Sequence, residues 1–427
     1  MTSVHSAKLF LKILGFFFLV LTNHAAQALS LKSPAFGDGG IIPNEFTFSS
    51  AGQCSGANAS PPLVFDGVPD GTMSFALTVR DPDGGNWLHW KTWNIPATVD
   101  AIPQNFSAWT PYSQATNDFG KLGYGGPCPP SGSHRYIFTL YALGVSSLSG
   151  EPNDAQLSAA ALQTATLTGT RSPASNVSWV SDKIIQKGWW WNPRESGRGF
   201  SIEQSSTTKN IFMAAYTYES TGAAMWYVSN LIRSTTSASP LHQGNMMSFV
   251  NGQSLQGAYR APNQINYSNV VFIHTIDSDR ALLTITNPDG NSPLVILALR
   301  RFEYFSGSLS APLPANTPES GWWWNPQESG KGYFIEIQKS GAFLAVYTYN
   351  VNGTPVWYSA YNTMTTSTSF QGNLQQYANG QAIGAVYVAP IASNSNVGTV
   401  QIQFTSPTTA TLTLPNGTAV PVSRFGF

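Results

Sequence analysis

Apolar residues alternate with polar or small residues along most of the chain, which is the pattern of half-buried β-strands. Phe75, Leu77 and Val79 follow this pattern and lead directly into Asp81-Pro82, where a strand is expected to end and a loop to begin. Glycine, proline and asparagine turns separate the other strand-like segments. We therefore predict an all-β protein.

Helical periodicity is expected in one short segment only. Asn153 or Asp154 is placed to cap a helix there. The apolar stripe of this helix would consist of Leu157, Ala161, Leu162 and Ala165. We expect the helix to pack on a sheet and to make no contact with a ligand.

The second half of the chain contains an internal repeat. A motif beginning at Gly188 reads GWWWNPRESGRGF, and one beginning at Gly321 reads GWWWNPQESGKGY. Each copy closes with Arg-Phe, and the turns Asn287-Pro288-Asp289-Gly290 and Pro415-Asn416-Gly417 indicate a late hairpin in each. We predict two tandem antiparallel β-rich domains, and the motif alone assigns them no activity.

These patterns divide the chain into a first domain, two repeats and their connections. The predicted boundaries are a signal segment at 1–28, a first domain at 29–171, a linker at 172–187, a first repeat at 188–303, a second linker at 304–320 and a second repeat at 321–427.

The N-terminus has the features of a secretory signal. Lys8 and Lys12 precede a short apolar run, and Ala26-Gln27-Ala28 provides a small-x-small cleavage site. The apolar run is well short of the roughly 20 residues that span a bilayer. We therefore predict export to the periplasm or the extracellular space, with cleavage near Ala28 and no membrane span.

The composition restricts the classes of partner. Charged residues make up 10% of the chain, against about 25% in average soluble proteins, and the formal net charge is zero. No basic field is available to hold nucleic acid or an anionic membrane. Low charge with 13% aromatic residues suits an extracellular β-protein that meets neutral partners, such as cell-surface or environmental glycans.

Two short blocks of the first domain concentrate groups that can bind an anion. The first block contains Asp81 and His89, and the second places a Gly126-Pro127 bend before His134 and Tyr136. Alternate residues of a strand share a face, so His134 and Tyr136 are expected to point into one cavity. Imidazole and phenol groups donate to phosphate oxygens, and glycine N–H groups can approach an anion closely.

Two neighbours of these blocks bear on the site. Arg135, between His134 and Tyr136, is expected to point away from it. Lys91 lies two residues after His89 and would share its face, where it would reach the anion or mark a sheet edge.

The order DPD…HW followed by GYGGPCPP…HRYIFTLYAL resembles the phosphatidylethanolamine-binding protein (PEBP) family, in its bacterial Raf-kinase-inhibitor-like (YbhB/YbcL) branch. The resemblance runs from about Phe36 to Thr170 and covers about a third of the chain. It implies a β-sandwich with a pocket for phosphate-like anions or phosphorylated amine head groups. Gly84-Gly85 stands where the family usually has Ala-Pro, so the loop before His89 is expected to be more mobile.

Cys54 and Cys128 are the two cysteines of the chain. An even count in an exported protein favours a disulfide. The alternative is two free thiols, because relatives that look cytosolic also carry cysteine at these positions. Cys128 between prolines is a poor nucleophile candidate, and no residue spacing matches a dedicated zinc site, so we predict neither a metal nor a cofactor.

The tryptophan motifs allow two interpretations. In a strand Trp190 and Trp323 face away from their neighbouring tryptophans. They would form platforms for sugar rings, with hydrogen bonds from Glu195 and Glu328, or the aromatics would be core and the Glu-Ser-Gly turn would serve the fold.

Together these features predict an exported, non-enzymatic binding protein. Its first domain would take a small anionic or phosphorylated ligand, and its duplicated modules would serve adhesion or structure. The alternatives are a glycan-binding surface protein and a hydrolase that uses the Asp81/His134 pair.

Overall fold

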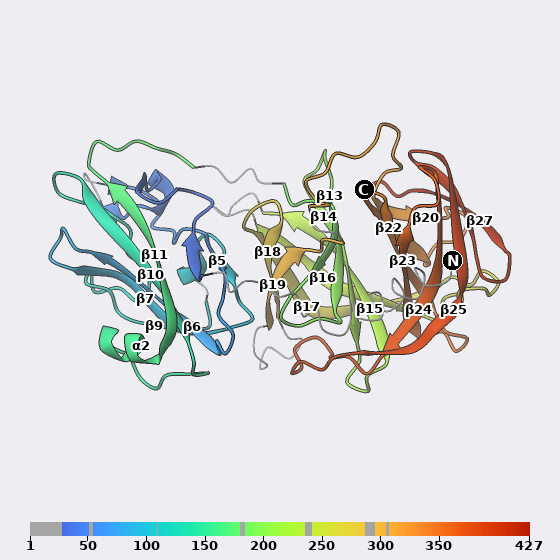
Figure 1. Cartoon of the computed structure of the whole chain (residues 1–427), viewed down its shortest axis with the longest axis horizontal. Coiled ribbons are helices and arrows are strands. Elements are labelled where there is room, and N and C mark those ends of the chain that lie inside the picture. Colours follow the sequence, from blue (N-terminus) through green and yellow to red (C-terminus); the bar gives the residue numbers. More distant parts are fainter. Residues whose placement is uncertain are drawn as a thin grey trace, which may run out of the picture.

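The computed structural model describes residues 28–50, 54–108, 110–179, 184–234, 241–286, 295–304 and 307–427. Three β-domains follow one another along its long axis (Figure 1). The predicted all-β fold, with one minor helix and two tandem antiparallel repeats, is confirmed. The predicted signal segment lies outside the described residues, except for Ala28.

The first domain is a sandwich of two sheets around an apolar core. One sheet has the order β2 (Gly40–Ile41), β11 (Ala161–Arg171), β10 (His134–Leu143), β6 (Ser74–Asp81), β7 (Trp87–Pro96) and β9 (Ser113–Gln114). The other has the order β1 (Ser30–Lys32), β5 (Leu63–Asp66) and β8 (Ala101–Ile102). The predicted alternation in β6 is correct, because Phe75, Leu77 and Val79 are all buried in this core.

Short elements complete the first domain. They are the 3-10 helices η1 (Asn44–Phe46) and η2 (Phe106–Ala108) and the paired strands β3 (Ser49–Ser50) and β4 (Cys54–Ser55).

The helix α2 (Asp154–Ala160) begins as predicted but ends early. Asn153 caps it, in a capping box with Gln156, and Leu157 is buried. The prediction that the helix continues through Ala161, Leu162 and Ala165 was wrong, since all three lie on β11, where Ala161 and Ala165 pair with β10. Threonines at 164, 166, 168 and 170 favour a strand there. In the described part of the chain, no helix has the length and apolar character to cross a membrane.

Each repeat is a closed eight-stranded antiparallel barrel. The first comprises β12 (Gly188–Trp191), β13 (Gly199–Gln204), β14 (Ile211–Tyr218), β15 (Ala224–Arg233), β16 (Leu241–Val250), β17 (Asn263–Thr275), β18 (Arg280–Ile285) and β19 (Val295–Arg301). The second comprises β20 (Gly321–Trp324), β21 (Gly332–Gln338), β22 (Gly341–Tyr349), β23 (Pro355–Thr363), β24 (Ser369–Ala378), β25 (Ile391–Ser406), β26 (Thr409–Thr413) and β27 (Ala419–Arg424).

The Arg-Phe ends of the repeats close these barrels. Trp190 pairs with Arg301 in the first, and Trp323 pairs with Arg424 in the second. The predicted turn at 415–417 joins β26 to β27, whereas its counterpart at 287–290 lies outside the described residues.

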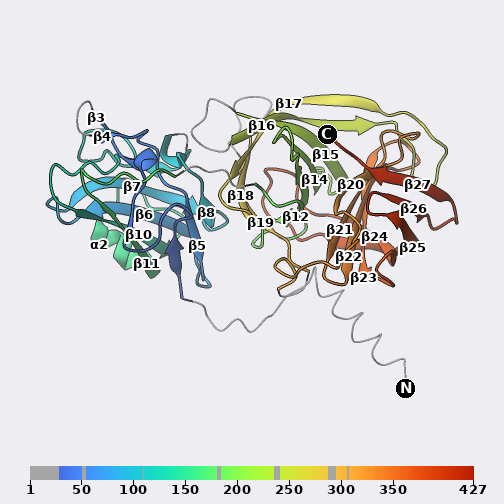
Figure 2. The same ribbon diagram turned by 90° about the horizontal axis from the view of Figure 1, so that it is seen from above.

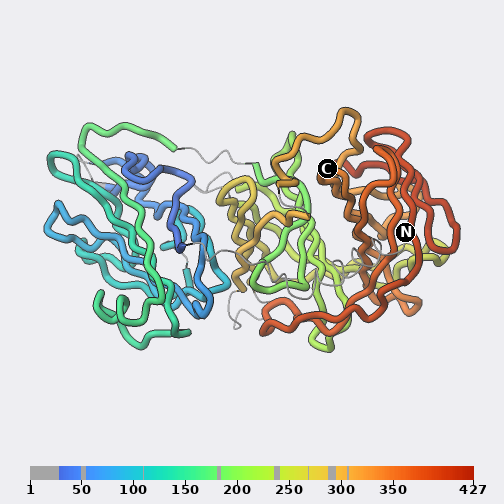
Figure 3. Tube along the Cα trace, in the orientation of Figure 1, coloured from blue at the N-terminus to red at the C-terminus, as the bar shows by residue number. Residues whose placement is uncertain are grey.

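The first domain packs against one side of the first barrel. Arg300 Nη2 lies 2.7 Å from Asp100 Oδ2, and Arg280 Nη2 lies 3.0 Å from Asp66 Oδ1. Leu282 joins the core of the first domain. The second barrel lies beyond the first, on the side away from the first domain (Figures 2 and 3).

Candidate functional site

Three neighbouring strands bring the predicted pocket residues together. β6 ends at Asp81, β7 carries His89 near its start, and β10 begins at His134. These strands are adjacent in the order β10-β6-β7. Residues that are far apart in the sequence therefore meet where the ends of these three strands lie side by side. Tyr136 follows two positions into β10, on the face of His134.

Asp81 and His134 form a hydrogen-bonded pair. His134 Nδ1 lies 2.7 Å from Asp81 Oδ2, and because a carboxylate accepts, the proton is on Nδ1. The Asp81 side chain is 6% exposed and that of His134 is 17% exposed. The more buried Asp81 therefore orients the imidazole through Nδ1, and Nε2 is the nitrogen that remains for a ligand.

The Gly84-Gly85 loop is tied to the same carboxylate. The Gly84 N–H donates to Asp81 Oδ1 at 2.8 Å. A Cβ at residue 84 would lie 2.8 Å from Asp81 Oδ2, so glycine permits this close approach.

His89 is held as a neutral imidazole below the surface. Its Nδ1 lies 2.6 Å from the Gly125 carbonyl oxygen, which can only accept, so Nδ1 carries the proton. Burial lowers the pKa of His89. His89 is therefore neutral at pH 7, with its Nε2 lone pair available to accept.

A β-bulge at His89 changes the expected face of Lys91. Val79 pairs with Trp90 but Arg80 pairs with Leu88, so β7 has one extra residue at this point. The expected sharing of a face by His89 and Lys91 was wrong for this reason. Lys91 Nζ instead donates to Glu151 Oε1 at 2.8 Å, before helix α2.

Aromatic rings surround the two imidazoles. The Tyr136 ring meets that of His89 edge-on at 5.0 Å, and burial followed by the nearby Asp81 raises the pKa of Tyr136. Phe119 lies 5.3 Å from the His89 ring and stacks on Phe48 at 4.5 Å. Sequence reasoning missed both phenylalanines, since a lone aromatic in a loop gives no signal of its partners.

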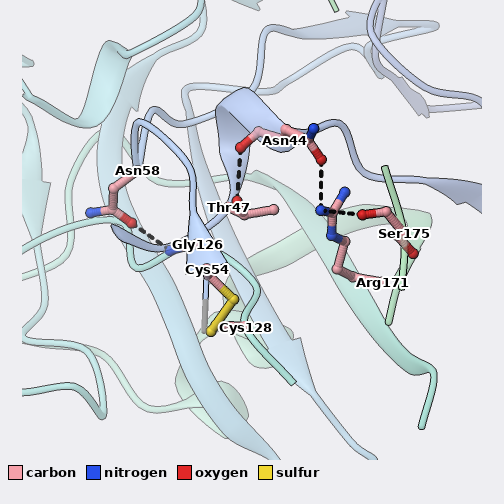
Figure 4. Close-up of a disulfide and its surroundings, with 8 residues drawn as sticks. All are labelled: Asn44, Thr47, Cys54, Asn58, Gly126, Cys128, Arg171 and Ser175. Carbon is pink, nitrogen blue, oxygen red and sulfur yellow. Dashed lines mark hydrogen bonds between the residues drawn. A yellow bond between two sulfur atoms is a disulfide. The ribbon is translucent and has the colours of Figure 1, made fainter. Parts of the chain in front are cut away.

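The Gly126-Pro127 bend packs against residues 46–48, at the end of η1, and hydrogen bonds hold it in place (Figure 4). The Gly126 N–H donates to Asn58 Oδ1 at 2.7 Å, and the Gly125 N–H donates to the His89 carbonyl at 2.8 Å. The expectation that these amides are free for an anion was therefore wrong for this structure. A Cβ at Gly126 would overlap the backbone of residues 46–48, so glycine is required for this packing.

The structure contains the Cys54–Cys128 disulfide and not two free thiols (Figure 4). It connects the segment after Pro127 to β4. The bend that carries Gly126 is thus held by a covalent bond as well as by hydrogen bonds.

Arg171 is a further residue that sequence reasoning missed. It pairs with His134 across β11 and β10. Its guanidinium donates to Asn44 Oδ1 at 2.6 Å and to the Ser175 carbonyl at 2.8 Å (Figure 4). It also donates to the Ile42 carbonyl at 2.8 Å. Arg171 therefore fastens η1 and the start of the following linker beside the pocket.

Arg135 points away from the pocket residues, as predicted, and pairs with Asp83. Its Nη2 lies 2.7 Å from Asp83 Oδ1, and its backbone N–H donates to Asp83 Oδ2 at 2.9 Å. These bonds lower the pKa of the exposed Asp83 carboxyl to about 2. Arg135 therefore balances the negative charge of Asp83, two residues after Asp81.

Among the described residues, no group of three or more His, Cys, Asp or Glu side chains is placed to hold a metal ion. The site therefore contains groups that donate and accept protons: the partly exposed His134 and the buried His89 and Tyr136.

The tryptophans proposed as sugar platforms are inside the barrels. Trp190 is 0% exposed and Trp323 is 1% exposed, each within the apolar interior of its barrel. This contradicts the platform hypothesis for these two residues, because a ring in a barrel core cannot stack on a sugar. Glu195 pairs with Arg198, and Glu328 pairs with Lys331 at 3.3 Å, so both carboxylates serve the motif turns.

Comparison with known proteins gives a consistent result for the first domain. The sequence model of the phosphatidylethanolamine-binding protein family matches residues 32–172. A UPF0098 protein of Methanothermobacter thermautotrophicus is 46% identical over 121 residues, which cover 27% of this chain and 76% of the relative. UPF0098 protein YbcL of Escherichia coli is 43% identical over 129 residues, which cover 28% of this chain and 70% of YbcL.

A solved structure of Escherichia coli YbcL, presented as a new member of the mammalian PEBP family, is 36% identical. It covers 34% of this chain and 99% of its own, with a TM-score of 0.32. The identity and coverage of the sequence relatives decide the assignment. Through residues 32–172, the chain belongs to the phosphatidylethanolamine-binding protein family.

Proposed function

We propose that the first domain binds a small phosphate-like anion or a phosphorylated head group, with His134 as its main contact. The observation that carries this proposal is the Asp81–His134 hydrogen bond, which uses Nδ1 and leaves Nε2 of the partly exposed ring for a ligand. With Nδ1 bonded to Asp81, Nε2 can accept from a P–O–H group or, when it carries a proton, donate to an anionic oxygen.

Two further groups favour a phosphate that carries an O–H group. His89 is neutral and offers Nε2 as an acceptor, whereas the Tyr136 hydroxyl donates or accepts. A phosphate monoanion has both acceptor oxygens and an O–H donor, and a sulfate dianion lacks the donor. The site is therefore better matched to phosphate than to sulfate.

Binding without catalysis is the better fit to these groups. A hydrolase that works through a covalent intermediate would need a nucleophilic side chain, and the sulfur of Cys128 is not free for this role because it is bonded to Cys54. The disulfide also supports an exported protein, because such bonds persist in oxidising compartments. We propose that the protein acts in the periplasm or outside the cell.

Phosphate and phosphoethanolamine are expected to stabilise the first domain. At one hundred times the dissociation constant, mass action gives about 2.7 kcal/mol of added stability. His134→Ala should remove the shift without unfolding the sheet, and thermal melts over a ligand series would measure it. The control is Lys121→Ala, which removes an exposed charge from the same domain and should behave as wild type.

Equal shifts in wild type and His134→Ala would place binding elsewhere. Release of inorganic phosphate from phosphoethanolamine by the wild type, lost in His134→Ala, would support the hydrolase alternative instead.

A second candidate function is binding of a neutral glycan by the second barrel. Residues 340–423 contain no Asp, Glu, Lys, Arg or His. Exposed amide and hydroxyl side chains lie in register across β24, β25 and β26, where Gln371 is opposite Gln401 and Gln401 is opposite Thr413. Thr399 Oγ1 donates to Asn373 Oδ1 at 3.0 Å in the adjacent row. Such a face can exchange hydrogen bonds with sugar hydroxyls.

The equivalent side of the first barrel is already occupied. There, opposed Arg280 and Arg300 dock the first domain, whereas the opposed residues in the second barrel are Thr409 and Ser423. We call the surface of Gln371, Asn373, Thr399, Gln401 and Thr413 the neutral face.

The neutral face should retain the full-length protein on insoluble cellulose or chitin but not on polygalacturonate. Gln371→Glu with Gln401→Glu places two like charges opposite each other, which should weaken retention at least tenfold. Ala315→Glu, on the exposed linker, is the control. Pull-down isotherms would measure the affinities, and equal retention of both variants would exclude the neutral face.

A further inference from the structure

The two barrels meet across an approximate twofold axis, with a buried carboxylate on each side of the interface. Glu336 of the second barrel accepts from the Trp189 N–H at 2.6 Å and pairs with Arg301. Glu203 of the first barrel accepts from the Trp322 N–H at 3.1 Å and pairs with Arg424. The two halves of the tryptophan motif thus bind equivalent carboxylates across the junction.

The indoles of β15 and β23 cross the interface in the same reciprocal way. Trp226 Nε1 donates to the Thr348 carbonyl at 3.0 Å, and Trp357 Nε1 donates to the Thr217 carbonyl at 3.2 Å. Thr348 Oγ1 donates to the Gln253 carbonyl at 2.8 Å, and Thr217 Oγ1 donates to the Gln381 carbonyl at 3.1 Å.

The Glu-Ser-Gly turn of each motif contacts a short segment of the other barrel, which we call the arm. The arm of the first barrel is residues 259–262, and the arm of the second barrel is residues 387–390. A Cβ at Gly197 would overlap the Pro390 ring, and a Cβ at Gly330 would overlap the Pro262 ring. Next to them, Ser196 Oγ lies 2.9 Å from the Tyr387 hydroxyl, as Ser329 Oγ lies 3.1 Å from the Tyr259 hydroxyl. Both glycines have positive φ, +97° and +91°, which other residues rarely adopt.

Aromatic rings fill the space between these polar contacts. Tyr216 of the first barrel and Tyr347 of the second lie 4.7 Å apart between ring centres, and Trp322 lies 5.2 Å from Tyr347. Residues of both barrels form this one buried cluster. The interface therefore has an apolar centre and reciprocal hydrogen bonds at its edges, as stable protein interfaces do.

Each repeat carries both halves of every contact described above. Repeat 1 holds the carboxylate Glu203 and also Arg301, which binds the carboxylate of the other repeat. It likewise holds the turn at Gly197 and the arm at Pro262. Such a surface is self-complementary, which is the condition for an isologous twofold pair.

We propose that the tryptophan motif marks a self-pairing module, whose partner is a second copy of the same module. In this chain the second copy is supplied in cis by the duplication. A homopair of repeat 1 would re-form the same contacts, Glu203 with Arg301 and Gly197 with Pro262. The role of the motif is therefore recognition between modules.

The linker adds contacts of its own near both carboxylates. On the Glu203 side, Glu319 Oε2 lies 3.3 Å from Nε of Arg424, which pairs with Glu203. The Tyr304 hydroxyl donates to Glu336 Oε2 at 3.1 Å and the Ser308 hydroxyl to Gln338 Oε1 at 2.5 Å. A cavity of about 470 Å³ lies beside the linker, and Lys187 and Glu319 are among the residues that line it. The tether thus raises the effective concentration of the partner and adds a few contacts, but it does not make the reciprocal ones.

Cleavage of the linker in the full-length protein tests the pairing. A protease recognition sequence inserted at Ala315, in an exposed part of the linker, lets the chain be cut after it has folded. The two pieces are expected to co-elute at micromolar concentration. Pieces that separate as folded monomers would overturn the proposal.

Two glycine variants test whether the described contacts hold the pair. After cleavage, Gly197→Ala should raise the dissociation constant of the two pieces at least tenfold, because the new Cβ meets Pro390. Gly417→Ala is the matched control, since Gly417 also has a positive φ, +84°, but has nothing within 4 Å of its Cβ position. Equal weakening by both variants would contradict the arm contact.

Self-complementarity is tested by exchange. The cleaved protein is taken into urea and returned to native buffer, and native mass spectrometry then counts the pairs. Homopairs of each piece should appear beside the original heteropair, and heteropairs alone would overturn the proposal. A second experiment avoids unfolding. In a full-length chain, the second repeat is replaced by a further copy of residues 188–301, and the linker is then cut. The two pieces should stay paired, and their separation as folded monomers would overturn the proposal.

Discussion

Trp323→Ala is expected to destabilise the second barrel by about 3–5 kcal/mol, the usual cost of truncating a buried tryptophan. The ring is 1% exposed and packs against Phe404 at 5.5 Å. Its Nε1 donates to the Glu319 carbonyl at 3.1 Å, so the substitution also removes a hydrogen bond that holds the linker. Trp190→Ala should have a similar effect on the first barrel, where Nε1 donates to the Gln186 carbonyl at 3.0 Å.

Val351→Ala is the control for this experiment. Val351 is 83% exposed in the turn between β22 and β23, so its truncation should change stability by less than about 0.5 kcal/mol. Differential scanning calorimetry of the full-length variants would measure the change in the barrel transition, because a chain of three domains need not unfold in one step. A Trp323→Ala protein that melts as wild type would show that the ring is not core.

The tryptophan motif shows how far alternation can be interpreted. The sequence correctly places Trp190 on the strand face opposite to Trp189, and the structure has Trp190 in the barrel interior. Alternation cannot tell which face meets water, and here even the face opposite Trp190 is only partly exposed. Trp189 lies against the second barrel, 4.4 Å from the Phe343 ring, so both faces of β12 are at least partly covered.

The boundary between α2 and β11 could not be predicted for a different reason. Local sequence after Leu157 is compatible with a helix, and the capping box at Asn153 is a strong start signal. The stop is set from outside the segment, by the pairing of Ala161 with Leu143 on β10. Contacts between distant segments override a weak local preference in this way.

The pocket was predictable as a set of residues but not as a geometry. Asp81 and His134 come from strand ends, and the family resemblance supplied their order. The bulge at His89 and the occupied Gly126 N–H depend on partners in other segments, Arg80 and Asn58, and no local pattern identifies them. The disulfide was predictable from the cysteine count and the expected export, whereas its position next to the Gly126-Pro127 bend was not.

Removal of the Cys54–Cys128 disulfide is expected to destabilise the first domain by about 4 kcal/mol. The bond joins residues separated by 74 positions, and the entropy of the unfolded chain rises when a loop of this length is opened. Cys54→Ser with Cys128→Ser gives the open form. Urea denaturation of the wild type and the double variant would measure the difference.

The same substitution should also weaken ligand binding in protein that remains folded. The bend held by Cys128 includes Gly125, whose carbonyl oxygen fixes the His89 tautomer at 2.6 Å. If the bend moves, His89 loses this acceptor and the orientation of its ring. We expect at least a tenfold weaker affinity for phosphate in the double variant, measured by calorimetric titration under conditions where it remains folded.

Wild-type protein treated with a reductant is the matched control, because it opens the same bond without changing any residue. It should reproduce both the lower stability and the weaker binding. Intact mass before and after alkylation shows whether the bond is present in protein from the native compartment. Two freely alkylating thiols there, with phosphate affinity equal to that of the oxidised form, would show that the pocket does not depend on this bond.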